Sequence, residues 1–366
     1  MTLEKGIIAS SQLTHLIIGF ILGSALLIAF ASRVTGRDTW IAVIIGCIVG
    51  IVFALTYVAL AIKFSGMTLI EINDAIWGKY IGKLISVLYI WFFFTLASQN
   101  LRYIGDFLVT YLMPETPLVI LTIIFVFICA WAVKEGIEVI ARSSFILIIV
   151  TSAVILIVTL LLIKELKFGN LLPILDIPLI DLIQGSHVIA GIPFGETVVF
   201  LFIFAYVNKP EEIRKSVIKA MVFCGIWFLV VTIRNIAVLG PSGSLYVSAS
   251  YQAARIIDIG VLFTRMEVLI AVALLSTVFL KITVFYYASV HGTATLLKLR
   301  TYKPLVIPYG IIIVSLSLII YDYSPQSDFF GSNFFPIYAL PYEFIIPLIS
   351  LIIAKIRGIS GKRSES

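Results

Sequence analysis

Ten long apolar runs constrain the fold of this chain more than any other feature. A helix needs roughly 20 apolar residues to cross the hydrocarbon core of a membrane, and the runs approach or exceed that length. They use most of the 366 residues and leave no room for a separate soluble domain, so we expect a single transmembrane domain over 1–366. The runs lie at 10–31, 39–63, 83–112, 117–133, 143–163, 184–206, 217–240, 264–297, 304–321 and 335–355.

Composition indicates which kind of span these runs form. Hydrophobic residues make up 61% of the chain, charged residues only 13%, and the mean hydropathy is +1.12. Backbone polar groups inside a bilayer must be paired within a helix or a closed barrel, and the alternating ten-residue segments of a barrel are missing. The sequence therefore predicts an all-α integral membrane protein with about ten transmembrane helices.

The positive charges indicate how the spans are oriented. Net charge is +6, and most lysines and arginines outside the spans fall in alternate connections, at 63–83, 134–142, 209–219 and 298–303, and in the C-terminal tail. Such asymmetry is typical of cytoplasmic loops, so we expect an even number of spans and both termini in the cytoplasm. We attribute these charges to contacts with anionic lipid headgroups and not to nucleic acid.

An internal echo suggests two related halves. The letters GFILGS at 19–24 in the first span return as GIPFGE at 191–196 in the sixth. An odd offset of five spans makes the copies cross the membrane in opposite directions, which predicts inverted repeats at about 10–163 and 184–355. Glycine and proline weaken a helix by about 1 and 3 kcal/mol, so Gly191, Pro193 and Gly195 predict a broken sixth helix. The alternative is that the glycines only let helices pack closely, and it weighs more for the first span, which lacks proline.

Ionisable side chains inside spans are costly and usually paired or functional. Arg102 and Asp106 share a helix face and are expected to pair. Lys281 lies near the middle of its span, far from water. If it faces a cavity, it is a candidate proton-coupling or cation-replacing group; the alternative is a static pair with Glu196 or with carbonyl groups. The remaining ionisable groups expected within the spans are Arg234, Arg265, Glu267 and Glu343.

Four connections have patterns of their own. Segment 67–83 predicts a short interfacial amphipathic helix, and 134–142 is a candidate for another. On the outer side, 253–263 is a candidate surface or re-entrant helix, and 321–336 is interpreted as an ordered loop.

Signatures of catalysis were not found. His15, His187 and His291 lie in different spans without zinc-site spacing, and no nucleophile elbow or P-loop occurs. Cys47, Cys129 and Cys224 lie far apart within apolar spans. We expect no enzyme activity, no cofactor and no metal site.

Several stretches together resemble the endospore germination permeases, the B subunits of spore germinant receptors, which are distant relatives of the amino acid/polyamine/organocation transporters. The resemblance covers essentially the whole chain. It rests on the residues at 19–29, Leu96-Ala97-Ser98 with Arg102, the Asn170-Leu171-Leu172-Pro173 stretch, Gly195-Glu196 and Arg265-Met266-Glu267.

The resemblance implies a LeuT-like five-plus-five fold, with a small solute held between broken helices 1 and 6 and walls from helices 3 and 8. Carried onto this chain, the substrate-binding residues are Gly23, Ser24, Ala25, Leu96, Asn100, Phe194, Gly195, Glu196, Thr277 and Lys281. Lys281 departs from sodium-coupled relatives, which have small hydroxyl residues there, and this argues against sodium coupling.

The resemblance also implies a function. The chain is expected to bind a small germinant, such as an amino acid, in the spore inner membrane and to signal to A- and C-type receptor subunits. A proton-coupled amino-acid transporter and an ion-conducting subunit are the alternatives, because all three would use the same pocket.

Overall fold

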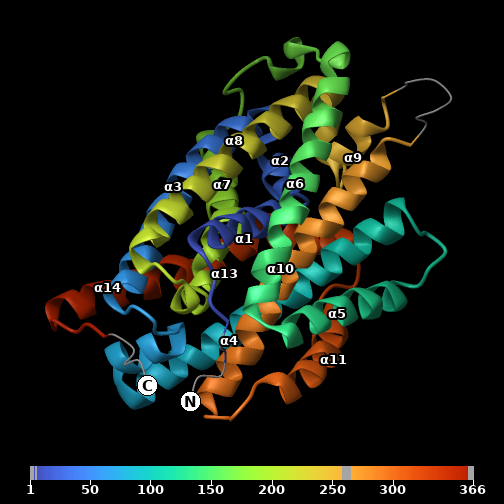
Figure 1. The fold of residues 1–366 in the computed structure, drawn as a ribbon. Helices are drawn as coiled ribbons and strands as arrows, with labels where there is room; N and C mark the ends of the chain where they lie inside the picture. Colours follow the sequence, from blue (N-terminus) through green and yellow to red (C-terminus); the bar gives the residue numbers. More distant parts are fainter. Residues whose placement is uncertain (1–3, 5, 258–264, 362–366) are drawn as a thin grey trace.

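The computed structural model describes residues 4, 6–257 and 265–361 as an elongated bundle of helices (Figure 1). By length and composition, eight helical stretches of the described chain suffice to cross a membrane, and two further apolar helices are shorter. The prediction of an all-α membrane protein is confirmed. The helices are α1 (Ser10–Leu22), α2 (Ile28–Thr35), α3 (Thr39–Lys63), α4 (Leu69–Tyr111), α5 (Leu118–Glu135), α6 (Ile137–Leu161), α7 (Leu179–Ile189), α8 (Ile213–Leu239), α9 (Ala249–Ala254), α10 (Glu267–Leu296), α11 (Lys303–Ile319), α12 (Ser324–Phe329), α13 (Phe335–Leu340) and α14 (Ile346–Ile356).

The first span is broken between α1 and α2. Residues 23–27 form tight turns, in which the Ser24 and Ala25 amides donate to the carbonyl groups three residues earlier, at Ile21 and Leu22. The hydrogen bonds of an α-helix are replaced here by bonds that span three residues, and the Ser24 side chain is buried in the bundle. The break therefore forms without a proline.

The sixth span is broken as well. After α7, the chain makes a wide π-helical turn, η4 (Ala190–Phe194), that contains Pro193, and then tightens into a 3₁₀ segment, η5 (Gly195–Phe202). Proline lacks the amide hydrogen that a regular helix needs, and π turns often occur at functional sites. The structure thus has a break where the glycines and proline predicted one.

The connections differ in part from the sequence expectations. A helix is present within 67–83 as the start of α4, which turns at Gly78, whose φ of 77° is left-handed and suits glycine. Its place at a membrane interface stays a prediction. Segment 134–142 is not a separate helix, since only Gly136 separates α5 from α6. The predicted outer loop at 321–336 is largely helical, from α12 into α13. Of the candidate helix at 253–263, residues 258–263 lie outside the described residues, and the helix observed nearby is α9.

The centre of the bundle is α10, which packs against α1, α4, α5 and α6 (Figure 1). Most of its side chains are buried, including Lys281. On one side of the molecule α3 contacts α7 and α8, and on another α5 contacts α11. This arrangement places the middle of α10 beside the break in the first span.

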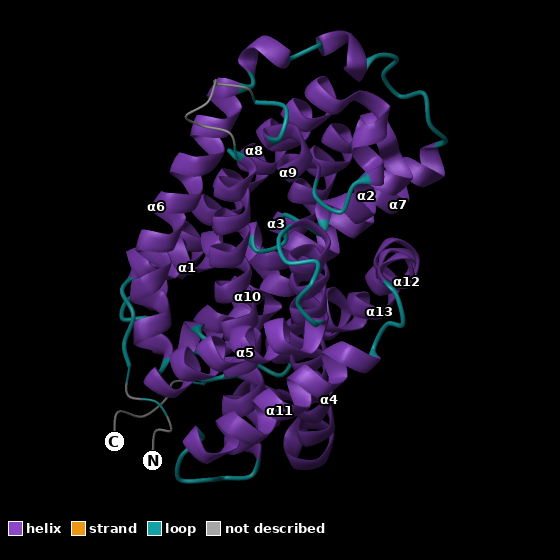
Figure 2. Ribbon diagram, turned by 90° about the vertical axis from the view of Figure 1, so that its right-hand side faces the viewer, coloured by secondary structure: helices purple, strands orange, loops and turns teal. Residues whose placement is uncertain are grey.

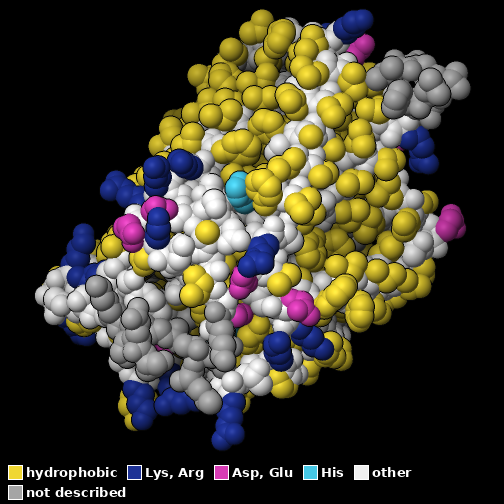
Figure 3. Space-filling model, in the orientation of Figure 1, with side chains coloured by type: hydrophobic (Ala, Val, Ile, Leu, Met, Phe, Trp, Pro, Cys, Tyr) yellow, Lys and Arg dark blue, Asp and Glu magenta, His cyan; other side chains and the backbone are white. Residues whose placement is uncertain are grey.

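The two described ends of the chain lie at the same end of the molecule, opposite α9 (Figures 1 and 2). Lysines and arginines gather around this end, whereas most of the remaining face is hydrophobic (Figure 3). A belt of exposed apolar side chains is what a lipid-facing surface requires. The distribution agrees with the charge asymmetry of the sequence.

Candidate functional site: a buried ion pair between two broken helices

The Lys281 side chain joins three helices at the centre of the protein. Its ammonium donates a hydrogen bond of 2.6 Å to Ser24 Oγ in the break of the first span. It also forms an ion pair with Glu196 at the start of η5, with 2.5 Å between Nζ and Oε2. The two charged side chains are 0% and 1% exposed. A buried charge needs a partner to be stable, and both partners of Lys281 come from other spans. The contact therefore links α10 to both broken spans.

Close backbone packing brings these groups within reach of each other. A Cβ added at Gly23 would lie 2.7 Å from the Thr277 carbonyl oxygen and 2.8 Å from Lys281 Cβ. Only glycine allows the first span and α10 to approach this closely. The Lys281 ammonium also lies 5.6 Å from the centroid of the Phe20 ring, at a distance suited to a cation–π contact. The pair therefore sits in a packed, water-poor environment.

Five of the residues predicted for the substrate site come together here: Gly23, Ser24, Glu196, Thr277 and Lys281. The expected alternative of a buried Lys281–Glu196 pair is the arrangement observed. The pair carries no net charge, so any ligand that opens it must satisfy both an ammonium and a carboxylate.

Other predicted residues have different neighbours. Phe194 packs against α3, where a Cβ at Gly50 would lie 2.3 Å from Phe194 Cβ, and its ring makes an edge contact with Phe228. The Asn100 amide donates to the Leu96 carbonyl one turn earlier in α4. No ion pair or hydrogen bond joins Leu96, Asn100 or Phe194 to Lys281 within the described part of the chain. The place of these three residues in a binding site stays a prediction.

Gly195 contacts a residue that the predicted site left out. A Cβ at Gly195 would lie 2.4 Å from Glu343 Oε2, on the turn η10 (Pro341–Ile345) between α13 and α14. The Tyr57 hydroxyl on α3 donates to the backbone carbonyl groups of both Gly195 and Glu343. An acid within the last apolar run is the sequence signal for Glu343, whereas nothing in the sequence singles out Tyr57.

Arg102 and Asp106 form the predicted pair, 2.9 Å apart. The Arg102 guanidinium also donates to carbonyl groups at the end of α11, including that of Tyr321 at 2.7 Å. Asp106 in turn accepts from the Ser324 hydroxyl at the start of α12. This pair therefore fastens the connection between α11 and α12 and lies apart from the Lys281 contact.

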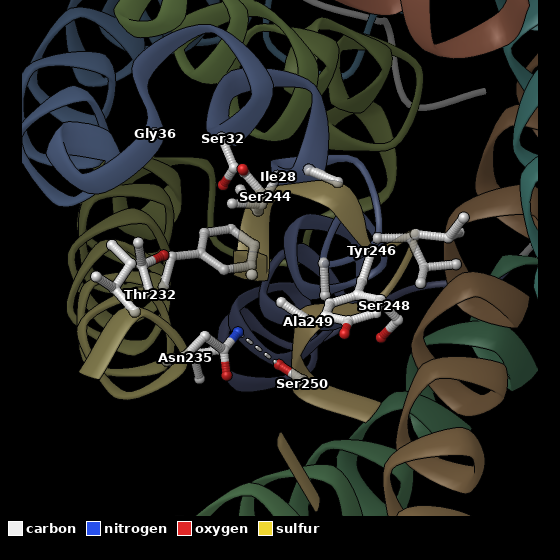
Figure 4. Close-up of a pocket in the computed structure, with 18 of the residues that line it drawn as sticks. Ile28, Ser32, Gly36, Thr232, Asn235, Ser244, Tyr246, Ser248, Ala249 and Ser250 are labelled. Atoms are coloured by element: carbon white, nitrogen blue, oxygen red, sulfur yellow. Dashed lines mark hydrogen bonds between the residues drawn. The ribbon is translucent and has the colours of Figure 1, made fainter. Parts of the chain in front are cut away.

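A cavity lies near the end of the molecule that carries α9, next to the break in the first span. It is lined by α2, α8, the segment after α8 and α9, with Ser32, Thr232, Ser244 and Ser248 among its polar residues (Figure 4). The Asn235 amide donates to Ser250 Oγ at 3.1 Å across one side of it (Figure 4). Ala25, adjacent to Ser24, forms part of its wall.

A second, more apolar cavity continues inward from this one. Its lining includes Leu22, Ala25, Trp227, Phe228 and Thr277. Ala25 and Phe228 belong to both cavities, and Thr277 lies one helical turn before Lys281. The two cavities thus share part of their wall, and the second reaches the immediate surroundings of the ion pair.

Near the end that carries the termini, the N-terminal segment is tied down by hydrogen bonds. The Glu4 carboxylate accepts from the Ile137 amide and from the hydroxyls of Tyr287 and Tyr302. Further along, the Ile8 amide donates to the Tyr206 carbonyl at the end of the broken sixth span. These contacts join α6, α10 and the sixth span to the N-terminal segment.

A family model described as "Spore germination protein" matches residues 7–324. The chain belongs to the spore germination protein family. It is 30% identical to spore germination protein KB of Bacillus subtilis (strain 168) over 357 residues, which cover 96% of this chain and 95% of that protein. Spore germination protein YndE of the same organism is 22% identical over 363 residues, covering 98% of each chain.

This spore germination protein is similar in fold to solved transporters. MhsT, solved in complex with L-phenylalanine, matches 95% of the chain with a TM-score of 0.65 and 12% identity, over 98% of its own length. Mhp1, a nucleobase-cation-symport-1 family transporter, matches 94% with a TM-score of 0.65 and 15% identity, over 77% of its length. At such identities the likeness concerns the fold alone, which is the predicted LeuT-like fold.

Proposed function

We propose that this chain is the transporter-like B subunit of a spore germinant receptor, which binds a small nutrient within the membrane and triggers germination. In this proposal the nutrient is an amino acid, and the signal passes to A- and C-type partner subunits. The chain lies in the spore inner membrane with both termini in the cytoplasm. The observation that carries the proposal is the buried Ser24–Lys281–Glu196 contact between two broken helices.

Charge balance favours an amino acid as the ligand. A zwitterion carries one carboxylate and one ammonium, the same two charges as the Glu196–Lys281 pair. If it enters between them, the ligand carboxylate replaces Glu196 as the partner of Lys281, and the ligand ammonium replaces Lys281 as the partner of Glu196. Every buried charge keeps a counter-charge, whereas a singly charged ligand would leave one unpaired at a cost of several kcal/mol.

The route to the pair supports entry from the outer side. The cavities at the outer end reach Ala25 and Thr277, close to the ion pair. MhsT, which has the same fold, was solved in complex with L-phenylalanine.

Binding to the purified chain in lipid nanodiscs tests the proposal. A panel of amino acids that includes L-phenylalanine is titrated while the thermal unfolding temperature is recorded. We expect at least one to raise it in the native protein but not in Lys281→Met, and Lys303→Met, at the exposed start of α11, serves as the matched control.

The same variants are then introduced into spores that lack the native gene. We expect Lys281→Met to abolish germination with the ligand found and Lys303→Met to preserve it. Absence of any thermal shift, together with normal germination of the Lys281→Met spores, would refute the proposal.

A second candidate function is a proton-coupled amino-acid transporter, favoured by the transporter fold and by the lysine in the middle of α10. The two candidates differ in whether bound ligand is released on the other side. Uptake of the labelled ligand into proteoliposomes, driven by a pH gradient and lost in Lys281→Met, would favour the transporter. Binding without uptake would favour the receptor subunit.

A further inference from the structure

Glu343 is a buried acid whose charge is not accounted for by the ion pair. Its side chain is 1% exposed and lies over the break in the sixth span. A Cβ added at Gly195 or Gly191 would lie 2.4 or 3.1 Å from its Oε2. Its other oxygen, Oε1, is buried without a hydrogen-bond partner in the described structure.

The polar groups around Glu343 are engaged elsewhere. Lys281 on α10 pairs with Glu196 on η5 and bonds Ser24. The Tyr57 hydroxyl on α3 donates to the Glu343 backbone carbonyl and not to its carboxyl group. The Tyr89 hydroxyl on α4 likewise donates to a backbone carbonyl, that of Tyr342, at 2.8 Å. None of these groups forms an ion pair or a hydrogen bond with the Glu343 carboxyl group, and the one positive charge in the described structure near enough to act on it, that of Lys281, is already paired with Glu196.

The buried side chains Glu196, Glu343 and Lys281 include two acids and only one base. If Glu196 and Glu343 are both ionised, Lys281 balances only one of them, and one negative charge stays in the interior of the bundle. An unpaired ionised carboxylate there costs several kcal/mol. One bound positive charge removes this cost.

The available space indicates which positive charge fits. A metal cation takes several oxygen ligands around it, yet Glu343 Oε2 is packed closely against the glycine backbone, and none of the cavities described above is lined by Glu343. A proton needs no cavity. A protonated acid, like a glutamine, is also compatible with close contact to a backbone that offers no counter-charge.

We propose that Glu343 is a proton-binding site in the core of this protein and that it holds a proton when the sixth span has the observed conformation. The site belongs to α13, α14 and the break in the sixth span, not to α10. When the break moves away from Glu343 and admits water, the proton is released as the carboxyl group ionises. The proposal does not depend on nutrient binding.

Infrared spectroscopy of the full chain in nanodiscs, without any amino acid added, tests this directly. In the native protein near neutral pH, we expect the carbonyl-stretching band of a protonated carboxylic acid, and we expect it to shift in D₂O. Glu343→Gln should remove the band. Glu267→Gln, at the start of α10, is the matched buried control and should retain it. A spectrum without the band, or a band that persists in Glu343→Gln, would overturn the proposal.

The nature of the bound charge is tested by changing salt at constant pH. If the band is absent in sodium or potassium buffer and appears only when these ions are replaced by a bulky organic cation, the site binds a metal cation and the proton assignment is wrong. If the band is indifferent to the salt, the assignment is supported.

Thermal unfolding provides a second measurement that does not rely on band assignment. Glutamine has the shape of the protonated acid, so Glu343→Gln should unfold at or above the native temperature, and its advantage should grow as the pH rises from about 5 to about 9. The reason is that rising pH favours ionisation of the Glu343 carboxyl group, which the observed fold disfavours, whereas a glutamine side chain does not ionise. A variant that is less stable than the native protein throughout, or that fails to fold, would mean that the charged form is required and would refute the proposal.

Discussion

Replacing Lys281 by methionine should destabilise the protein strongly, because it leaves Glu196 charged and buried. The ammonium lies 2.5 Å from Glu196 Oε2, and neither side chain is more than 1% exposed. Removing one member of a buried pair typically costs about 3–5 kcal/mol, whereas replacing both by uncharged groups of similar volume is often nearly neutral. We therefore expect a loss of about 3–5 kcal/mol in Lys281→Met and recovery of most of it in the double variant with Glu196→Gln.

The assay is reversible unfolding in mixed micelles, with the free energy of unfolding taken for both single variants and the double variant. The exposed pair Glu138–Arg142 on α6 is the matched control, and its cycle should give a coupling of about 0–1 kcal/mol. If the losses of Lys281→Met and Glu196→Gln simply add in the double variant, the two side chains do not form an interdependent pair. A loss below about 1 kcal/mol in Lys281→Met would likewise refute the reasoning.

Three further changes test other contacts. Gly23→Ala should cost about 1–3 kcal/mol in the same assay, because its Cβ would meet the Thr277 carbonyl oxygen at 2.7 Å, whereas Gly169→Ala, with no atom within 4 Å, should be neutral. Ser250→Ala removes a partner of both Arg234 and Asn235, at 2.9 and 3.1 Å. It should therefore speed the labelling of a cysteine introduced at Ser32 in the cavity beside α9, and an unchanged rate would argue against α9 restricting access. Glu4→Ala removes an acceptor of two tyrosine hydroxyls and should cost about 1–3 kcal/mol and accelerate proteolysis near the N-terminus; an unaltered cleavage rate would contradict it.

The helices were predictable because the bilayer requires long apolar segments, and the break in the sixth span because Pro193 cannot complete a regular helix. The Arg102–Asp106 pair was predictable from its spacing of four residues along one helix. These features depend on local sequence. The segment at 321–336 was expected to be a loop because of its polar residues, yet Ser324 bonds Asp106 and begins α12, a tertiary contact that outweighs composition.

The partners of the buried charges were only partly predictable. A Lys281–Glu196 pair was one of two open alternatives. The hydrogen bond from Lys281 to Ser24 was not predictable, because it joins residues 257 positions apart. Glu343 was visible as an acid in an apolar run, but its contact with Gly195 depends on how the last span is rotated about its axis. A hydrophobic pattern that is apolar all around a helix does not specify that rotation. The residues that complete a membrane site therefore depend on tertiary packing and not on spacing.

Under the proposed function, the central ion pair would act as a switch that responds to a small molecule. A ligand can shift a conformational equilibrium only by the difference in its affinity for the two states. In the closed pair, Lys281 is satisfied by Ser24 on the first span and by Glu196 on the sixth, so both breaks are held to α10. A zwitterion that takes over these charges would release the two breaks from α10 and from each other, while leaving no charge unpaired. A shift from 1:99 to 99:1 needs about 5.5 kcal/mol of differential binding. The amino acid would therefore have to bind the state with released breaks about 10⁴-fold more tightly than the observed state to switch the bundle fully.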